Sequence, residues 1–491
     1  MKKALQIHGG DNVAVALSPL SAGEATLGVT MLEPIPAGHK FALTGIASGA
    51  PVVKYGLPIG FAKGDIAPGV WVHTHNVKTG LEEDARYAYS PIRPELPPVS
   101  PRSFLGYPRE DGRAGIRNEL WIIPTVGCVN DVCKSLEAEN ASLSAQYGLD
   151  GVFHFPHPYG CSQMGDDHEQ TRRLLAALCR HPNAGGVLVV GLGCENNKME
   201  DFRTLFGPEY QRKLRFMVCQ QEEDELAVGG RLLGELAEYA SRFQRQALPA
   251  SKLVVGMKCG GSDGLSGITA NPTVGAFSDK LIAMGGTTIL TEVPEMFGAE
   301  SLLLNRCKDE ATFRKAVDMV EGFKRYFIAH NQVVYENPSP GNKDGGITTL
   351  EDKSMGCVQK GGSAPVVDVL GYGEPVSVPG LNLLYGPGND LVSATALTAS
   401  GAQMILFTTG RGTPFGAPAP TLKISTNTPL FEKKPHWLDF NAGPVAEGET
   451  VEAASDRLLD LVFHTAGGAY QTRAEEHHQR GIAIWKNGVT L

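Results

Sequence analysis

Five apolar runs in the middle of the chain each end at a cysteine. The runs are WIIPTVGC to Cys128, GVFHFPHPYGC to Cys161, GVLVVGLGC to Cys194, RFMVC to Cys219 and KLVVGMKC to Cys259. The first two intervals are equal, because 161 − 128 and 194 − 161 both give 33 residues, about the length of one strand-plus-helix unit. The spacing therefore predicts cysteines at the carboxyl ends of adjacent parallel strands, where open sheets place their ligands.

Thiolates that converge at one edge of a sheet form a soft site suited to iron or zinc. We expect a metal at this edge, held by some of Cys128, Cys161, Cys194, Cys259 and Cys357. Each of them taken singly could instead pack as a small hydrophobic residue, and none has CxxC spacing. Cys179 and Cys307 stand in helical patterns and are expected in the core.

Acid/base candidates accompany these cysteines. His157 precedes Cys161 on its loop, and Glu195 directly follows Cys194, where it could act as a ligand, a base or a helix N-terminal partner. His73 and His75 are two residues apart in VHTHN, a spacing that puts both rings on one face of a strand. The pair could bind metal or exchange protons near pH 7, or it could be an exposed pair without a function.

Glycine-rich loops suggest where an acidic substrate would bind. The segment CGGSDGLSG at 259–267 could form a nest of N–H groups that holds a carboxylate or phosphate. The candidate residues of this nest are Gly260, Gly261, Ser262 and Asp263. The cations Lys343, Lys360 and Arg411 lie in other glycine-rich loops and could pair with an acid, although solvated surface positions would explain them too. GLGCEN lacks the third glycine of a dinucleotide fingerprint and no GKS or GKT follows a strand, so we expect no nucleotide cofactor.

Composition limits the class of protein. A chain of 491 residues exceeds what one core usually organises, so two or three domains are expected. A net charge of −9 argues against a general binder of nucleic acid or anionic membranes. There is no run of about 18 apolar residues and no signal-peptide core. We therefore expect a cytoplasmic enzyme with reduced thiols.

The chain divides into four segments by pattern. Residues 1–80 show short strands between turn signals and predict a small all-β domain. Residues 81–108 are rich in proline and predict an extended linker. Strands then alternate with helical patterns through a first α/β region at 109–250 and a second at 251–491, predicting a mostly parallel sheet of seven or more strands. The polar stretch from Tyr335 to Gly362 is either a lid or an exposed insertion.

Taken together, the motifs resemble those of the altronate and galactarate dehydratase family. The resemblance rests on GHKFAL, VVKYGLPIG, HTHN, RNELWIIPTVGCVN, HPYGCSQMGDD, GLGCEN, CGGSDGLSGITANP, TEVPEMFGAE, ENPSPGNKDGGITTLEDKS and GRGTPFG, which span nearly the whole chain. It implies a β-clip N-terminal domain of the SAF type, a Rossmann-like C-terminal domain, a homodimer (with 109–250 as a possible dimerisation domain), and ferrous iron (Fe2+), with Mn2+ as an alternative.

The activity implied by the resemblance is dehydration of D-altronate to 2-keto-3-deoxy-D-gluconate in the breakdown of galacturonate. The chemistry would remove the C2 proton beside a carboxylate and expel the C3 hydroxyl, which needs a Lewis acid, cations and a base. We place iron among the cysteines, Arg411 and the glycine loop on the carboxylate, and His73 or His75 as the acid/base group. Rival hypotheses are galactarate dehydration, sulfo-lyase activity on a hydroxysulfonate, a non-catalytic sugar-acid sensor, and an iron–sulfur protein.

Overall fold

The N-terminal unit is built from short antiparallel strands. The computed structural model describes residues 2–81, 87–334 and 337–490. A four-stranded sheet has the order β1-β2-β5-β8, a three-stranded sheet the order β6-β7-β9, and β3 pairs with β4. The bounds are β1 Ala4–Leu5, β2 Val13–Ala16, β3 Ala25–Thr26, β4 Val29–Thr30, β5 Lys40–Ala42, β6 Pro51–Lys54, β7 Leu57–Ala62, β8 Trp71–Val72 and β9 Val77–Lys78. Val13, Val52, Ile59 and Val72 pack between the sheets, as the alternation of apolar residues and turns predicts.

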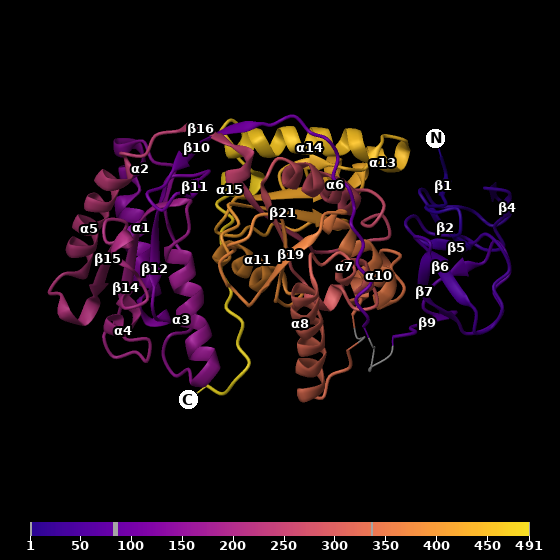
Figure 1. The fold of residues 1–491 in the computed structure, drawn as a ribbon, viewed down its shortest axis with the longest axis horizontal. Coiled ribbons are helices and arrows are strands. Elements are labelled where there is room, and N and C mark those ends of the chain that lie inside the picture. The colour runs from indigo at the N-terminus through magenta and orange to yellow at the C-terminus, as the bar shows by residue number, and fades with distance from the viewer. Residues whose placement is uncertain (1, 82–86, 335–336, 491) are drawn as a thin grey trace.

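The proline-rich segment runs in extended form across the C-terminal unit (Figure 1). Its described part is fixed by side-chain bonds. The Tyr87 hydroxyl donates to Glu300 at 3.1 Å, and the Tyr89 hydroxyl donates to the Cys307 carbonyl at 2.8 Å. These contacts, with a bond from Arg93 to the Cys307 carbonyl at 3.3 Å, fix residues 87–93 on the C-terminal unit.

The second unit is a four-stranded parallel sheet with the order β13-β12-β14-β15. Its strands are β12 Glu119–Pro124, β13 Gly151–His154, β14 Ala184–Gly191 and β15 Leu214–Val218. The principal helices are α1 Asn130–Asn140, α2 Ser142–Tyr147, α3 Gly165–Cys179, α4 Met199–Arg203 and α5 Glu225–Ala240. All residues of β12 and β14 are buried, which is why these strands read as unbroken apolar runs.

A small antiparallel sheet connects the second unit to the third. It has the order β11-β10-β16, with β10 Ser103–Pro108, β11 Ala114–Gly115 and β16 Gln246–Pro249.

The C-terminal unit is a parallel sheet of seven strands with the order β19-β20-β18-β17-β21-β22-β23. Its strands are β17 Val254–Cys259, β18 Thr287–Leu290, β19 Val366–Leu370, β20 Leu381–Leu384, β21 Met404–Thr409, β22 Thr421–Ser425 and β23 Phe440–Asn441. Its helices are α6 Ala270–Ala283, α7 Ser301–Leu304, α8 Glu310–Ala329, α9 Pro340–Asp344, α10 Leu350–Cys357, α11 Asp390–Ala399, α12 Thr428–Lys433, α13 Pro444–Glu447, α14 Val451–Ala466 and α15 Arg473–Glu476. The prediction of parallel α/β structure is thus confirmed, but it is divided between two sheets.

The first strand of this sheet along the chain, β17, lies in its middle. The next strand, β18, pairs on one side of β17, and β21 pairs on the other. Such a switch in direction leaves a crevice at the carboxyl ends of the strands. Cys259, the last residue of β17, therefore stands at the place where a ligand is expected.

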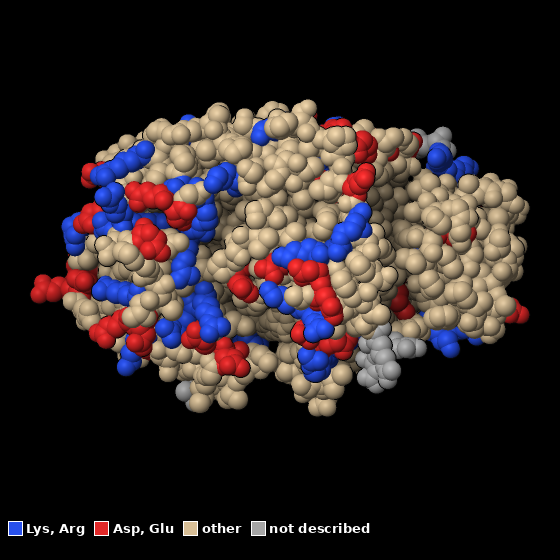
Figure 2. All heavy atoms as spheres, viewed as in Figure 1, with Lys and Arg blue, Asp and Glu red and all other residues tan. Residues whose placement is uncertain are grey.

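Charged side chains of both signs are interspersed on the face shown in Figure 2, mainly over the second unit and around α8. No helix among residues 2–81, 87–334 and 337–490 is long and apolar enough to cross a membrane.

Candidate metal centre and substrate cavity

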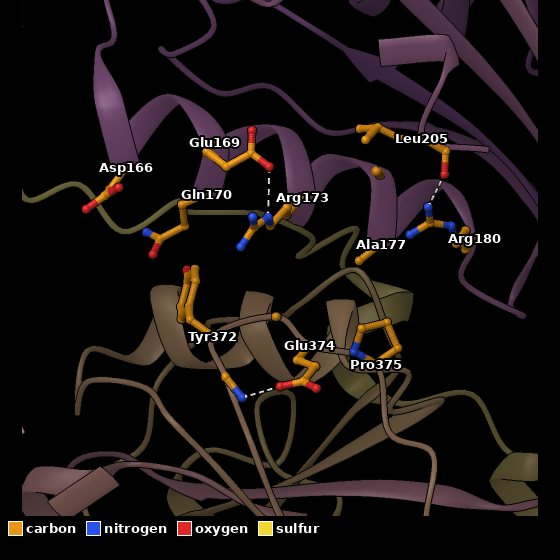
Figure 3. A pocket seen from close by; sticks show the side chains of 13 residues that line it. Asp166, Glu169, Gln170, Arg173, Ala177, Arg180, Leu205, Tyr372, Glu374 and Pro375 are labelled. Atoms are coloured by element: carbon orange, nitrogen blue, oxygen red, sulfur yellow. Dashed lines mark hydrogen bonds and ion pairs between the residues drawn. The ribbon is translucent and has the colours of Figure 1, made fainter. Parts of the chain in front are cut away.

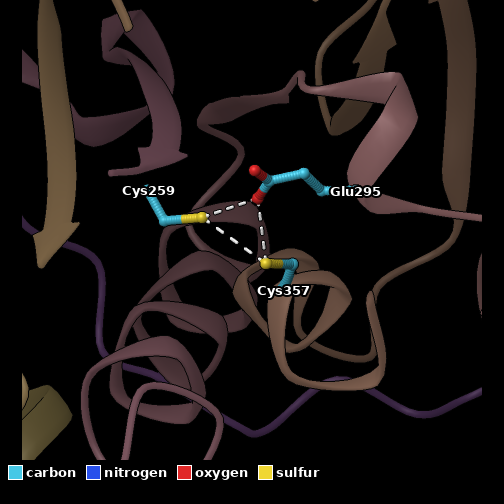
Figure 4. Close-up of side chains that lie close together, drawn as sticks. All are labelled: Cys259, Glu295 and Cys357. Atoms are coloured by element: carbon cyan, nitrogen blue, oxygen red, sulfur yellow. Dashed lines mark hydrogen bonds between the residues drawn. The ribbon is translucent and has the colours of Figure 1, made fainter. Parts of the chain in front are cut away.

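Two thiols and one carboxylate meet at the carboxyl end of β17 (Figure 4). Glu295 Oε2 lies 3.0 Å from the sulfur of Cys259 and 3.0 Å from that of Cys357. The two sulfurs are 3.5 Å apart. All three residues are at most 5% exposed, so the cluster is fixed inside the protein.

Three separate elements bring these side chains together. Cys259 ends β17, and its N–H donates to Glu292 Oε2 at 2.8 Å. The chain after β18 turns at Glu292, whose φ of 73° is a left-handed conformation that costs energy in a residue with a side chain, and it then presents Glu295 from a short 3-10 helix. Cys357 ends α10, a fully buried helix capped by the Thr349 hydroxyl.

Buried lysines surround the cluster. Lys353 Nζ lies 2.7 Å from Glu295 Oε1, and Lys360 Nζ lies 3.4 Å from Glu292 Oε2. Burial raises the pKa of a carboxyl, but Lys353 and Lys360 outweigh it and lower the pKa of Glu295 to about 2. The bond with Cys259 and burial raise the pKa of the Cys357 thiol well above its usual range. The pocket therefore holds an ionised carboxylate beside a protonated thiol.

A cavity of about 460 Å³ opens beside the cluster. Its wall includes Cys259, Gly261, Glu295, Asn342, Lys353 and Asp390. Asn342 is held by its amide, which donates to the Ser262 carbonyl at 2.9 Å, and its oxygen accepts from Lys353 at 3.2 Å. The cavity thus offers an ammonium group and an amide beside the thiols, a combination that suits a small hydroxy acid.

The cluster fits a divalent metal ion. The two sulfurs and one carboxylate oxygen lie within 4.8 Å of one another, and Cys259 and Glu295 also line the cavity. Three protein ligands with a free position are the arrangement of catalytic metal sites. Sulfur donors favour iron or zinc over magnesium or calcium. Glu295 offers the metal one oxygen, since Lys353 bonds the other.

Comparison with known proteins agrees with this architecture. Residues 2–80 match the altronate/galactarate dehydratase SAF domain, 106–241 the D-galactarate dehydratase/altronate hydrolase second domain, and 250–490 the D-galactarate/altronate dehydratase C-terminal domain. The chain belongs to the D-galactarate/altronate dehydratase family. It is 53% identical to an altronate dehydratase of Escherichia coli strain K12, with 99% of each chain covered. It is 49% identical to one of Bacillus subtilis strain 168 over the whole of both chains, and 34% identical to an E. coli galactarate dehydratase (L-threo-forming), with 97% and 96% covered.

The five cysteines predicted to bind metal do not gather at one place in this member of the family. Cys128, Cys161 and Cys194 follow β12, β13 and β14 of the second unit and are exposed. Cys259 and Cys357 are buried in the C-terminal unit. The expectation of a single edge was wrong because the equal spacing continues only through the first sheet.

His157 and Glu195 hold loops of the second unit. The ring of His157 lies 2.8 Å from the Pro124 carbonyl through Nε2, and its Nδ1 accepts from the Tyr159 N–H at 3.2 Å. Glu195 accepts from the Thr125 hydroxyl at 2.8 Å and the Gly193 N–H at 2.6 Å. Both side chains are buried with these partners, an arrangement that favours a positioning role over the predicted catalytic one.

His73 and His75 of the SAF domain do not lie on a strand. β8 ends at Val72, and residues 73–76 form a turn in which the His73 N–H donates to Asn76 Oδ1 at 2.9 Å. The prediction that both rings share a strand face was therefore wrong. His73 is buried beside Thr348, with 3.2 Å between Nδ1 and Oγ1, and burial lowers its pKa to about 4. His75 is exposed, and neither ring lines the 460 Å³ cavity.

Among the residues predicted to bind substrate, Gly260 and Gly261 line the cavity. Ser262 and Asp263 do not line it. Asp263 accepts from the Thr426 hydroxyl at 2.9 Å and the Ser266 hydroxyl at 3.0 Å, so its carboxylate is occupied within the loop. The predicted nest thus contributes two glycines to the wall, while Asp263 stabilises the loop through its hydrogen bonds.

The three predicted cations differ in position. Lys360 is 1% exposed and faces Glu292, which lies beside the cluster. Arg411 is exposed, with its nearest bond 3.5 Å long to the Gly341 carbonyl, and Lys343 is half-buried on α9. Neither Arg411 nor Lys343 lines the cavity. The stretch 335–362 is largely buried on α9 and α10 instead of forming an exposed insertion; its first two residues lie outside the described part.

Sequence reasoning missed Glu292, Glu295 and Lys353. The motif TEVPEMFGAE directly follows an apolar run, and two acids three residues apart after a strand, beside a proline, were a usable signal. Lys353 stands inside an ordinary helical pattern, where nothing in the sequence marks it as buried.

A second cavity, of about 490 Å³, lies between α3 and residues 371–375 (Figure 3). Its charged wall includes Glu169 and Arg173, which pair at 2.8 Å. It shares no wall residue with the cavity beside Cys259 and contains none of the predicted site residues.

Proposed function

We propose that this chain is a hydro-lyase that converts D-altronate into 2-keto-3-deoxy-D-gluconate and water, in the breakdown of galacturonate. The observation that carries the proposal is the full-length identity of 53% and 49% to two altronate dehydratases. The galactarate dehydratase is more distant at 34%, and a (2R)-sulfolactate sulfo-lyase beta subunit of Chromohalobacter salexigens is 32% identical over 78% of this chain.

The cavity beside Cys259 is the proposed site of the reaction. Removing the proton at C2 builds negative charge on the neighbouring carboxylate, so the site must supply positive charge there. Lys353, whose pKa is raised by Glu295 and the thiols despite its burial, stays protonated at neutral pH and faces the cavity. Asn342, Gly260 and Gly261 line the same wall. The Gly260 N–H is taken by the Thr408 carbonyl at 3.0 Å, so Gly260 shapes the wall and does not offer its N–H to the substrate.

The metal proposed for this site is Fe2+, with Mn2+ as the alternative, held by Cys259, Glu295 and Cys357. A bound divalent ion would supply Lewis-acid stabilisation of the charge that develops in the reaction. The protonated state of Cys357 implies that loading the ion releases a proton, because the ligand is the thiolate.

Three further properties are proposed from the family resemblance. The C-terminal sheet, parallel and entered at its middle strand, supports a Rossmann-like arrangement. The second unit is proposed to form the interface of a homodimer, and the enzyme is proposed to act in the cytoplasm on a small sugar acid, without nucleic acid or membrane partners.

Substrate choice is tested with anaerobic protein loaded with Fe2+ and a thiol, by following 2-keto-3-deoxy acid formation from altronate, galactarate and gluconate. We expect turnover of altronate well above that of the other two. A preference for galactarate would mean that this aldaric acid, and not altronate, is the substrate. Saturable altronate binding without turnover would support the alternative hypothesis of a non-catalytic sugar-acid sensor.

A further inference from the structure

Three exposed cysteines follow neighbouring strands at the carboxyl edge of the four-stranded sheet. Cys128, Cys161 and Cys194 follow three neighbouring strands in the order β13-β12-β14. All three are exposed, whereas Cys133 and Cys179 of the same unit are buried. Cysteine is among the most buried residue types, so three exposed ones at one edge need an explanation other than packing.

Hydrogen bonds tie the three cysteine loops to one another. The Gly127 N–H donates to the Tyr159 carbonyl at 2.8 Å, which joins the Cys128 loop to the Cys161 loop. The Asn197 N–H donates to the Gly160 carbonyl at 3.1 Å, and Asn196 Oδ1 accepts from the Ser162 N–H at 2.9 Å. These last two bonds join the Cys161 loop to the Cys194 loop, so the three thiols project from one connected surface.

The loops have little freedom to move apart. Gly160 has a φ of 102°, and a Cβ there would lie 2.0 Å from the Thr125 carbonyl oxygen. The buried carboxylate of Glu195 bonds Thr125 of the first loop and Gly193 of the third. His157 bonds the Pro124 carbonyl from the second loop. Residues predicted to be catalytic therefore hold the cysteines in place.

The three thiols are not arranged for a single metal ion. Thiolates bound tetrahedrally to one ion at about 2.3 Å lie roughly 4 Å apart. Within residues 2–81, 87–334 and 337–490, ligand atoms that all lie within 4.8 Å of one another are found only at Cys259, Glu295 and Cys357. Cys128, Cys161 and Cys194 do not form such a group, so their thiols do not stand at the spacing that a single ion requires. In a cluster each thiolate binds a different iron, so the thiolates need not lie within this distance of one another.

Polar side chains already lie near two of these sulfurs. The Gln220 amide lies 3.8 Å from the Cys194 sulfur, and the Ser162 hydroxyl lies 3.9 Å from that of Cys161. Hydrogen bonds to the sulfurs of an iron–sulfur cluster help to set its reduction potential.

We propose that Cys128, Cys161 and Cys194 hold a [4Fe–4S] cluster in the second unit. Four irons with three thiolates leave one iron without a cysteine, and this iron can take an oxygen ligand such as a carboxylate or hydroxyl group. The centre is distinct from the site at Cys259, because the two lie on different sheets. The inference is independent of which sugar acid the enzyme dehydrates.

The cluster is tested by anaerobic reconstitution of the full chain with ferric iron, sulfide and a thiol that reduces half of the iron to the ferrous state, followed by assay of acid-labile sulfide and visible absorbance. We expect about four sulfides per wild-type chain, and loss of most of them in Cys128→Ser, Cys161→Ser and Cys194→Ser. Cys219→Ser, at the end of the neighbouring strand β15, and Cys357→Ser are matched controls that should keep the cluster. Far-ultraviolet circular dichroism shows that each variant is folded.

Absence of labile sulfide from the folded wild-type protein would overturn the proposal, as would bound zinc in its place or loss of the cluster in Cys357→Ser.

The iron without a cysteine ligand has its own test. Ferricyanide should take one electron from the [4Fe–4S]2+ form and release one Fe2+, leaving a [3Fe–4S]+ centre visible by electron paramagnetic resonance. A cluster that resists this oxidation would have four protein ligands and contradict the three-cysteine assignment.

Discussion

Lys40 of the SAF domain and Asp352 of α10 form an ion pair of 2.7 Å in which both side chains are completely buried. Lys54 joins the same carboxylate at 3.1 Å. Since α10 also carries Lys353 and Cys357, the N-terminal domain holds the helix that supplies two groups of the proposed site. Figure 1 shows the domain beside α10.

Breaking this pair should destabilise the protein strongly. Lys40→Met leaves the buried Asp352 carboxylate with one ion-pair partner, Lys54, and one backbone donor, the Thr348 N–H. We expect the free energy of unfolding to fall by about 3 kcal/mol. Lys78→Met, at an exposed position of β9, should change it by less than about 0.5 kcal/mol. Urea denaturation of both variants measures the difference. Equal stability of the two would mean that the domain contact contributes little.

The cluster of Cys259, Glu295 and Cys357 should bind Co2+, whose absorbance shows whether sulfur atoms are among its ligands. Anaerobic Co2+ should give the thiolate-to-metal absorbance of a sulfur-bound ion in the wild-type protein, and Cys259→Ser or Cys357→Ser should weaken it sharply, since each removes a ligand sulfur. Cys219→Ser should leave the band unchanged, because that thiol, at the end of β15 in the second unit, belongs to neither proposed metal centre. A band lost in Cys219→Ser but kept in Cys357→Ser would place the ion elsewhere.

Lys353 and Lys343 provide a matched pair of cations. Lys353 bonds Glu295 and faces the cavity, whereas Lys343 is half-buried outside it. Lys353→Met should lower kcat/KM for altronate by about 100-fold or more, equivalent to about 2.7 kcal/mol, while Lys343→Met should stay within about threefold. The reverse order would favour the sequence-based choice of Lys343.

The His157 ring should make the fold sensitive to acid. Burial lowers the folded-state pKa of His157 to about 4, from 6.5 when exposed. As the pH falls from 6.5 to 4, the His157 ring takes up a proton in the unfolded chain but not in the folded one. Protonation therefore favours the unfolded state, and the free energy of unfolding falls by about 3 kcal/mol from its value above pH 6.5. His157→Gln should remove this contribution and flatten the pH dependence measured by urea denaturation. It should keep turnover at neutral pH, and a loss of turnover in the folded variant would restore His157 as a catalytic residue.

The sequence was informative where structure is local. Cys128, Cys161 and Cys194 could be placed at strand ends because buried parallel strands are continuous apolar runs that stop at a loop. The His73–His75 pair was misplaced because the Asn76 side chain closes a turn, an interaction that residue periodicity does not report. Glu295 approaches Cys259 and Cys357 from 36 and 62 residues away, so only the strand order of the seven-stranded sheet brings them together.

The most direct test of the account is anaerobic altronate turnover by Fe2+-loaded wild-type protein beside Glu295→Gln. The variant keeps the size of the side chain but removes the charge that bridges the thiols and Lys353. We predict that the wild-type protein forms 2-keto-3-deoxy-D-gluconate and that the folded variant loses at least about 100-fold in kcat. Turnover by Glu295→Gln at the wild-type rate would contradict the assignment of the reaction to this cluster.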